Sequence, residues 1–121
     1  MEDKQALEAV VEAYRKGSFT NDAELLASAF HDDAWVSGVI GEEHMCIPAP
    51  EFVKVATGEP ESAEQKGCNF VVEIDEIDID GPVAHVKFHE YDNNGTDYIT
   101  HFLCTKRGER WAIQAKLFLV V

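Results

Sequence analysis

The second half of the chain contains four segments with strand character, and short turns join them. The segments are rich in β-branched and aromatic residues and span residues 70–79, 83–91, 97–106 and 111–121. Each turn carries a glycine and is short enough for a hairpin, and the turns lie at residues 80–82, 93–95 and 107–109. Strands joined in this way pair with their chain neighbours, so the pattern predicts an antiparallel meander.

The first of these strands alternates irregularly. Its apolar positions Ile74, Ile77 and Ile79 slip by one residue at Asp75 and Glu76. An extra residue in one strand of an antiparallel pair is a β-bulge, and a bulge bends the strand that carries it. The sheet is therefore expected to be curved.

The first half of the chain begins with two helical patterns. The first has apolar residues at i, i+3, i+4 and i+7 and is expected to end at Gly17; its stripe comprises Leu7, Val10, Val11 and Tyr14. The second is expected to be capped by Asn21, because Glu24 follows three residues later in a capping-box relation. Its apolar stripe comprises Leu25, Leu26, Ala29 and Phe30.

Shorter elements connect the helices to the meander. Residues 35–40 predict a strand that returns through Met45 to Ile47 as a hairpin. Residues 51–56 predict a short helix that buries Phe52 and Val55, and the polar stretch 59–69 predicts a mobile loop. Helices followed by a bent sheet indicate an α+β fold, and 121 residues fit one domain, residues 1–121, around one core.

Charge and cysteine content limit the classes of partner and cofactor that the chain is expected to bind. The chain has 23 acidic and 10 basic residues and a formal charge of −13, which disfavours binding to nucleic acid or to an anionic membrane. No signal-peptide pattern or membrane-spanning apolar run is present, which predicts a cytoplasmic protein. Cys46, Cys68 and Cys104 are widely spaced and predict reduced thiols, and no motif indicates a metal or a cofactor.

Alternation along the strands sorts side chains onto two faces of the sheet. The face expected to lie under the helices is apolar near residues 80–81 and mixed at its far end, which indicates a cavity that the helices cover incompletely. The residues expected to line this pocket are Trp35, Phe52, Phe88, Glu90, Tyr98, Thr100, Phe102, Gln114 and Lys116.

The opposite face of the sheet is too apolar to remain in water. Its apolar members are predicted to be Ile99, Leu103, Trp111, Ile113 and Leu117. An exposed patch of this kind marks an interface. Since the helices are assigned to the other face, the simplest cover is the same face of a second copy, and a homodimer is expected.

Several stretches of the chain form a combination known from one protein superfamily: residues 21–26, 29–34, 80–84, 96–98 and 110–113, with Lys116 and Phe118. Together they resemble the nuclear transport factor 2-like superfamily, and within it the group labelled putative lumazine-binding or SnoaL-like. The resemblance implies a cone of three helices wrapped by a curved antiparallel sheet, commonly dimeric, with a pocket between the helices and the concave face. The superfamily includes enzymes and non-catalytic pocket proteins, so the fold does not decide the function.

Three residues are candidates for chemistry in the pocket. Glu90 and Lys116 are expected to face inward as an ion pair, either structural or with Glu90 as general base and Tyr98 as donor to an enolate oxygen. His31 either caps the second helix or acts at the pocket rim. His85, His89 and His101 share the outward face, where dimer contacts explain them better than a metal site.

Three functions remain open at this point. The first is a protein that binds a partly aromatic or carbonyl-bearing small molecule without turning it over. The second is an isomerase, dehydratase or cyclase that abstracts a proton next to a carbonyl. The third is a dimeric interaction module built on the outward face of the sheet.

Overall fold

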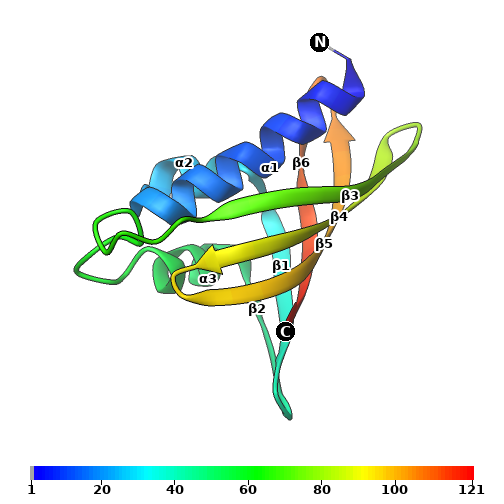
Figure 1. The fold of residues 1–121 in the computed structure, drawn as a ribbon. Coiled ribbons are helices and arrows are strands. Elements are labelled where there is room, and N and C mark those ends of the chain that lie inside the picture. Colours follow the sequence, from blue (N-terminus) through cyan, green and yellow to red (C-terminus); the bar gives the residue numbers. More distant parts are fainter. Residues whose placement is uncertain (1) are drawn as a thin grey trace.

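The fold is a curved six-stranded sheet with helices packed against it (Figure 1). The computed structural model describes residues 2–121. In chain order the elements are α1 (Asp3–Thr20), α2 (Ala23–Ser28), β1 (Phe30–Ile40), β2 (Glu43–Pro48), α3 (Ala49–Ala56), β3 (Val71–Asp80), β4 (Val83–Asn93), β5 (Thr96–Arg107) and β6 (Arg110–Val120). The α+β class and the cone of helices on a curved sheet are thus confirmed.

The strand order is β2-β1-β6-β5-β4-β3. Strands β3 to β6 form the predicted antiparallel meander, and β1 and β2 form the predicted hairpin. The sequence did not predict that β1 pairs with β6 in parallel, with Val36 opposite Lys116 and Gly38 opposite Phe118. This pairing places the start of the chain's β structure beside its last strand.

Helix α1 runs three residues beyond its expected end at Gly17. Gly17 lies within the helix and packs closely against α2, because a Cβ at this position would lie 2.6 Å from the Leu26 backbone nitrogen. The helix ends instead at Asn21, which adopts a left-handed conformation with φ 54°. The expected cap of α2 is also displaced by one residue, since the Asp22 carboxylate accepts a hydrogen bond from the Leu25 nitrogen.

Helix α3 begins earlier than expected, with Pro50 in its first turn. The prediction that it buries Val55 is wrong, because Val55 is 70% exposed and Val53 is buried in its place. The stretch 59–69 contains no helix or strand, as predicted. The Glu64 nitrogen donates to the Phe19 carbonyl across 3.0 Å, which ties this loop to the end of α1.

Bulges in β3 and β6 bear on the predicted faces of the sheet. The predicted one in β3 is confirmed by a shift in register between Ile74 and Glu76. The second, in β6, was not predicted: Leu103 pairs with Ala115 and Cys104 with Ile113, which leaves Gln114 as the additional residue.

The bulge in β6 reverses the expected faces at the start of that strand. Trp111 and Ile113 were assigned to the outward face, but both belong to the buried core. The indole nitrogen of Trp111 donates to the Asp3 carboxylate in α1 across 3.0 Å. The face assignment fails before the bulge and holds after it, where Lys116 and Phe118 are buried and Leu117 is exposed.

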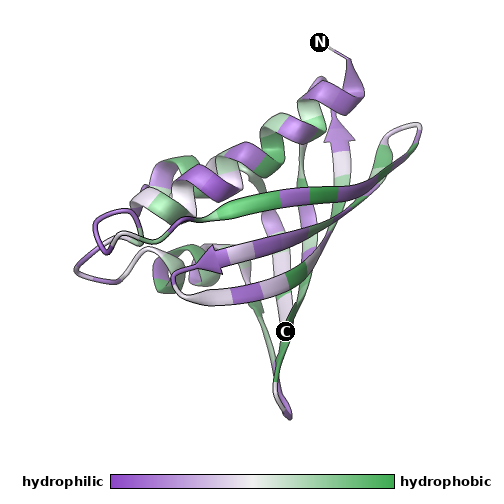
Figure 2. Cartoon of the chain, in the orientation of Figure 1, coloured by the Kyte–Doolittle hydropathy of each residue, from purple (hydrophilic) through white to green (hydrophobic). Residues whose placement is uncertain are grey.

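The core lies between α1 and the middle strands. Hydrophobic and hydrophilic positions alternate along α1 and the strands (Figure 2). Three rings meet edge to face, with centroids 5.1 Å apart for Tyr14 and Phe102 and 4.8 Å apart for Phe88 and Phe102. Among the described residues, no helix is both long and apolar enough to span a membrane.

Candidate ligand-binding site

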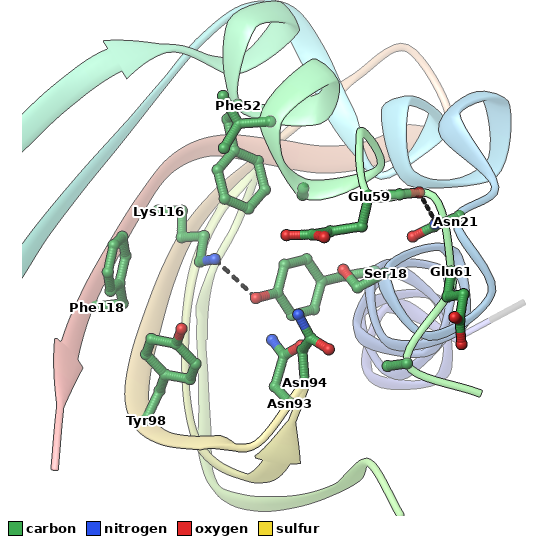
Figure 3. A pocket seen from close by; sticks show the side chains of 14 residues that line it. Ser18, Asn21, Phe52, Glu59, Glu61, Asn93, Asn94, Tyr98, Lys116 and Phe118 are labelled. Atoms are coloured by element: carbon green, nitrogen blue, oxygen red, sulfur yellow. Dashed lines mark hydrogen bonds between the residues drawn. The ribbon is translucent and has the colours of Figure 1, made fainter. Parts of the chain in front are cut away.

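A cavity of about 200 Å³ opens between α1, α3, the 59–69 loop and the far ends of β4, β5 and β6 (Figure 3). Four aromatic residues line it: Tyr14, Phe52, Tyr98 and Phe118. Its polar and charged lining residues are Ser18, Asn21, Glu59, Glu61, Asn93, Asn94 and Lys116. The cavity therefore combines ring surfaces with a small number of polar groups, as small-molecule sites do.

Lys116 is enclosed by aromatic rings in this cavity. Its Nζ atom lies 4.6, 4.3 and 4.9 Å from the ring centroids of Tyr14, Phe52 and Phe118. These distances are those of cation–π contacts, which stabilise a desolvated ammonium. The Phe118 ring fits in this position because residue 38 is glycine. A Cβ added there would lie 2.0 Å from the ring.

Lys116 and Glu90 are connected through the Tyr14 hydroxyl. Lys116 Nζ donates to that hydroxyl across 2.7 Å (Figure 3). The hydroxyl in turn donates to Glu90 Oε1 across 3.0 Å. All three side chains are buried. The direct ion pair predicted for Lys116 and Glu90 is thus replaced by a bridge from α1, because Tyr14 lies between the two charged groups.

The Glu90 carboxylate is enclosed by donors. Besides Tyr14, the Asn93 amide donates to it across 2.8 Å, and the Thr100 hydroxyl also donates to it. Glu90 is 1% exposed and lies below the cavity without lining it. A buried carboxylate with three donors has its charge compensated.

Burial changes the acid–base chemistry of the site. It lowers the pKa of Lys116 to about 8, and the nearby Glu90 carboxylate opposes part of this change. Burial, and then Glu90, raise the pKa of the Tyr14 hydroxyl well above its usual value. The same two causes raise the pKa of Tyr98.

Three of the nine residues predicted to line the pocket do so, and four others lie beneath it. Phe52, Tyr98 and Lys116 line the cavity. Glu90 and Thr100 lie beneath it, bonded to each other, and Phe88 and Phe102 pack their rings against Tyr14 in the layer below.

The remaining two predicted pocket residues lie away from the cavity altogether. Trp35 is 50% exposed and pairs with Ala115 on the outward side of the sheet. Gln114 is the bulge residue of β6, and its amide donates to the Asp33 carboxylate across 3.1 Å. The Gln114 prediction is wrong because strict alternation was assumed through β6. The Trp35 prediction is wrong because β1 turns its neighbours Ala34 and Val36 into the core instead.

His31 is separate from the other two residues predicted for catalysis. It lies in β1, is 2% exposed, and its Nε2 atom is 2.9 Å from the Thr105 carbonyl oxygen. It lines a different cavity, between α2, α3 and β1, rather than the rim of the Lys116 cavity. The predicted cap of α2 by His31 is not observed either, because the residue belongs to a strand.

Sequence reasoning missed Tyr14 as a site residue. It occupies the last position of the apolar stripe of α1, where a tyrosine was counted as one more core residue. The available signal was its hydroxyl, because a buried tyrosine needs a hydrogen-bond partner. Nothing local in the sequence indicates that the partners are Lys116 and Glu90, which lie 102 and 76 residues away.

The outward histidines form two separate contacts. His85 Nε2 lies 2.9 Å from His101 Nδ1, and His89 forms a 2.6 Å contact with the Asp75 carboxylate. Across residues 2–121, no cluster of three or more potential metal ligands occurs.

Nearly the whole chain matches a protein-family model. The model is described as putative lumazine-binding and matches residues 2–119. The chain belongs to this putative lumazine-binding family. No curated protein matches the chain at a significant level.

Solved structures support the fold of this member of the family. A nuclear transport factor 2-like protein of unknown function from Methylobacillus flagellatus KT has 23% identity and a TM-score of 0.86, covering 98% of this chain and 92% of its own. One from Silicibacter pomeroyi DSS-3 has 17% identity and a TM-score of 0.84, covering 100% of both chains. A ketosteroid isomerase-like protein from Erwinia carotovora atroseptica SCRI1043 has 17% identity and a TM-score of 0.72, covering 99% and 97%. These TM-scores show a shared nuclear transport factor 2-like fold.

Proposed function

We propose that the protein binds a small, partly aromatic, carbonyl-bearing molecule in the Lys116 cavity and releases it unchanged. The observation that carries this proposal is the arrangement of three rings and one ammonium around the same space. The rings offer flat apolar contacts, while the ammonium offers a hydrogen-bond donor.

The size and polarity of the cavity restrict the ligand. A volume of about 200 Å³ suits a molecule of one or two rings, since sites for drug-sized ligands begin at roughly 300 Å³. A carbonyl oxygen accepts from Lys116, and the Asn93 and Asn94 amides can bond a polar ring edge. Lumazine, named in the family's description, is a fused two-ring compound with carbonyl groups and is therefore the first ligand to test.

Calorimetric titration with lumazine and simple aromatic amides tests the proposal. We expect binding by the wild type and about tenfold to hundredfold weaker binding by Lys116→Met, because a hydrogen bond from a charged donor is lost. The matched control is Lys16→Met, which removes an exposed lysine of α1 and should leave affinity unchanged. Absence of binding by the wild type across this ligand set contradicts the proposal.

The geometry favours binding over proton abstraction. A general base must reach the proton it removes, but Glu90 is 1% exposed and lies beneath the cavity lining. Its three donors also support the structural interpretation of the Glu90 and Lys116 pair. Nuclear magnetic resonance of a bound ligand in D₂O distinguishes the two functions, since proton abstraction exchanges hydrogen for deuterium next to the carbonyl.

We also propose that two copies of the chain associate through the outward face of the sheet. Three large apolar residues, Trp35, Leu103 and Leu117, are each at least 50% exposed there. Surfaces of this kind are normally covered by a partner. Such a dimer is compatible with ligand binding, because the Lys116 cavity opens on the helical side. The cytoplasmic location expected from the sequence stays a prediction.

A further inference from the structure

Lys116 has bonding capacity that the protein does not use. An ammonium carries three donors, and the structure gives its Nζ atom one hydrogen bond, to Tyr14. Of the described residues that line the cavity, Lys116 alone carries an amine. A nitrogen that is buried, faces a cavity and is held beside a hydroxyl is placed to react with a molecule that enters.

Burial also makes the neutral form of Lys116 more accessible. Desolvation lowers the pKa of Lys116 to about 8, and Glu90 opposes only part of this change. The titratable groups that face it are Tyr14 from α1, Glu90 from β4, Tyr98 from β5, and Glu59 and Glu61 from the loop. Amines become nucleophiles when desolvation favours the unprotonated form.

We propose that Lys116 forms a Schiff base with small aromatic aldehydes that enter the cavity. The proposal rests on the proposed function, because the aldehyde occupies the same space as the reversible ligand. It goes further by assigning a covalent bond between the lysine nitrogen and the carbonyl carbon.

The hydrogen-bonded groups next to Lys116 supply the proton transfers that the reaction needs. The ammonium first gives a proton to the Tyr14 hydroxyl while that hydroxyl passes its own proton to Glu90, across contacts of 2.7 and 3.0 Å. The neutral nitrogen then forms a bond to the carbonyl carbon, and a proton moves from nitrogen to the carbonyl oxygen. The product of this step is a carbinolamine.

The second half of the reaction returns the proton. Glu90 sends it back through Tyr14 to the carbinolamine hydroxyl, which leaves as water while the nitrogen lone pair forms the C=N bond. The sum is one ammonium and one aldehyde giving one protonated Schiff base and one water, and no oxidant or reductant is consumed. Glu90 ends as the carboxylate with which it began.

The cavity also indicates which aldehydes react. Phe52 and Phe118 offer ring surfaces on either side of the amine, which favour a flat aromatic molecule (Figure 3). Glu59 and Glu61 line the entrance, and the Glu59 carboxylate points into the cavity, so an aldehyde with a negative charge is disfavoured. Benzaldehyde is uncharged and has one ring, and it is the probe of choice.

The test is reductive trapping of benzaldehyde with sodium cyanoborohydride, followed by peptide mass spectrometry. At pH 8 we expect one benzyl group per chain at Lys116, introduced at least about tenfold faster than at exposed lysines, whose pKa is about 10.4. The matched variants are Lys116→Arg, which should lose the label, and Lys16→Arg, which should keep it. Equal labelling of all lysines, or labelling of another lysine before Lys116, overturns the proposal. The α-amino group is scored separately, because its ordinary pKa is about 8.

A second variant keeps the test decisive if Lys116→Arg does not fold. Tyr14→Phe retains the ring and removes the proton-transferring hydroxyl, so labelling of Lys116 should slow by about 100-fold. Labelling of this variant at the wild-type rate contradicts the assigned role of Tyr14.

Benzamide separates the Schiff base from the proposed function, because it presents a carbonyl and does not form a Schiff base under these conditions. If benzamide binds in calorimetry and benzaldehyde leaves no label on Lys116, the Schiff base is overturned and the binding function stands. If benzamide also fails to bind, the binding function has lost its support as well.

Discussion

Tyr14 joins a helix to two strands through one oxygen atom. Its hydroxyl accepts from Lys116 in β6 and donates to Glu90 in β4, and its ring packs against Phe88 and Phe102. A buried network of this type is stable only when every member is bonded. Loss of the hydroxyl leaves two buried charges without their shared partner, so the phenol is a structural element of the floor of the cavity.

The lowered pKa of Lys116 predicts a pH dependence of stability. The folded pKa of about 8 is below the unfolded value of 10.5, so between these values the unfolded chain binds more protons than the folded one. Raising the pH through this window therefore stabilises the fold, and the full penalty for burying the charge is present below pH 8. From pH 7.5 to 9.5 the wild type should gain about 2 kcal/mol relative to Lys116→Met.

Urea unfolding of both proteins at pH 7.5, 8.5 and 9.5 measures this difference. Lys16→Met removes an exposed lysine and should follow the wild-type curve. Parallel pH curves for the wild type and Lys116→Met are incompatible with the lowered pKa.

The three cysteines should differ in reactivity. Burial raises the pKa of Cys104 to about 12, while Cys46 is exposed. Since the thiolate is the reacting species, Ellman's reagent should modify Cys46 rapidly in the native protein and Cys104 only after unfolding. Cys46→Ser should remove the rapid phase. A rapid phase that survives this substitution and maps to Cys104 would show that the thiol is accessible.

For single residues, the face on which a side chain lies was predictable, whereas its contacts with residues far away in the sequence were not. Strand alternation placed Tyr98 and Lys116 at the pocket, and the predicted third helix placed Phe52 there, without knowledge of their partners. It did not reveal that the Tyr14 hydroxyl lies between Lys116 and Glu90, because that contact depends on how α1 is positioned over the sheet. A periodic pattern identifies the face on which a residue lies, and the bond it makes there is decided by tertiary packing.

At the scale of elements, one additional residue decides which side chains of β6 face the helices. The bulge at Gln114 turns Trp111 and Ile113 into the core, where strict alternation had placed them outside. The bulge in β3 was predictable because the slip between Ile74 and Ile77 interrupts an alternation that is otherwise regular. Around Gln114 the strand is apolar on both sides, and a shift of one residue leaves no mark in such a pattern.

The contact between α1 and α2 leads to a prediction for Gly17. A Cβ there would lie 2.6 Å from the Leu26 nitrogen and 2.8 Å from its Cα, so the helices must separate to accept it. Gly17→Ala should therefore destabilise the protein by about 1–3 kcal/mol, although alanine favours a helix over glycine by about 1 kcal/mol. Thermal unfolding followed by circular dichroism measures the loss.

The neighbouring exposed residue provides the control. Lys16→Ala changes the same turn of α1 on its solvent side and should alter stability by less than about 0.5 kcal/mol. A Gly17→Ala variant more stable than the wild type would mean that α1 and α2 are not in close contact.

At the scale of the whole molecule, the proposed dimer has a direct test. The wild type should sediment at twice the 13.5 kDa mass of one chain. Leu117→Glu places a charge in the middle of the outward apolar surface and should produce monomers, because an unpaired charge is costly to bury. Sedimentation equilibrium of both proteins at several concentrations measures the association.

Val55→Glu is the matched control, since Val55 is also exposed but lies on α3. It should remain dimeric. A wild type that sediments as single chains, or a Leu117→Glu variant that remains dimeric, contradicts the proposed interface.

The helices and the meander were more predictable than the parallel pairing that joins β1 to β6. Short turns and helical stripes predicted the meander and the helices that precede it, because both depend on neighbours in the chain. The parallel pairing of β1 with β6 joins Val36 to Lys116 across most of the sequence. Nothing in residues 35–40 distinguishes β6 from any other free strand edge, so this pairing required the structure.

The contact between Gly38 and the Phe118 ring means that a residue outside the cavity lining determines the position of one cavity wall. Gly38 lies in β1, behind the ring, and has no contact with the enclosed space. A methyl group at this position would displace the ring and with it one wall around Lys116. The range of molecules that the protein accepts can therefore change through one substitution that no inspection of ligand contacts would reveal.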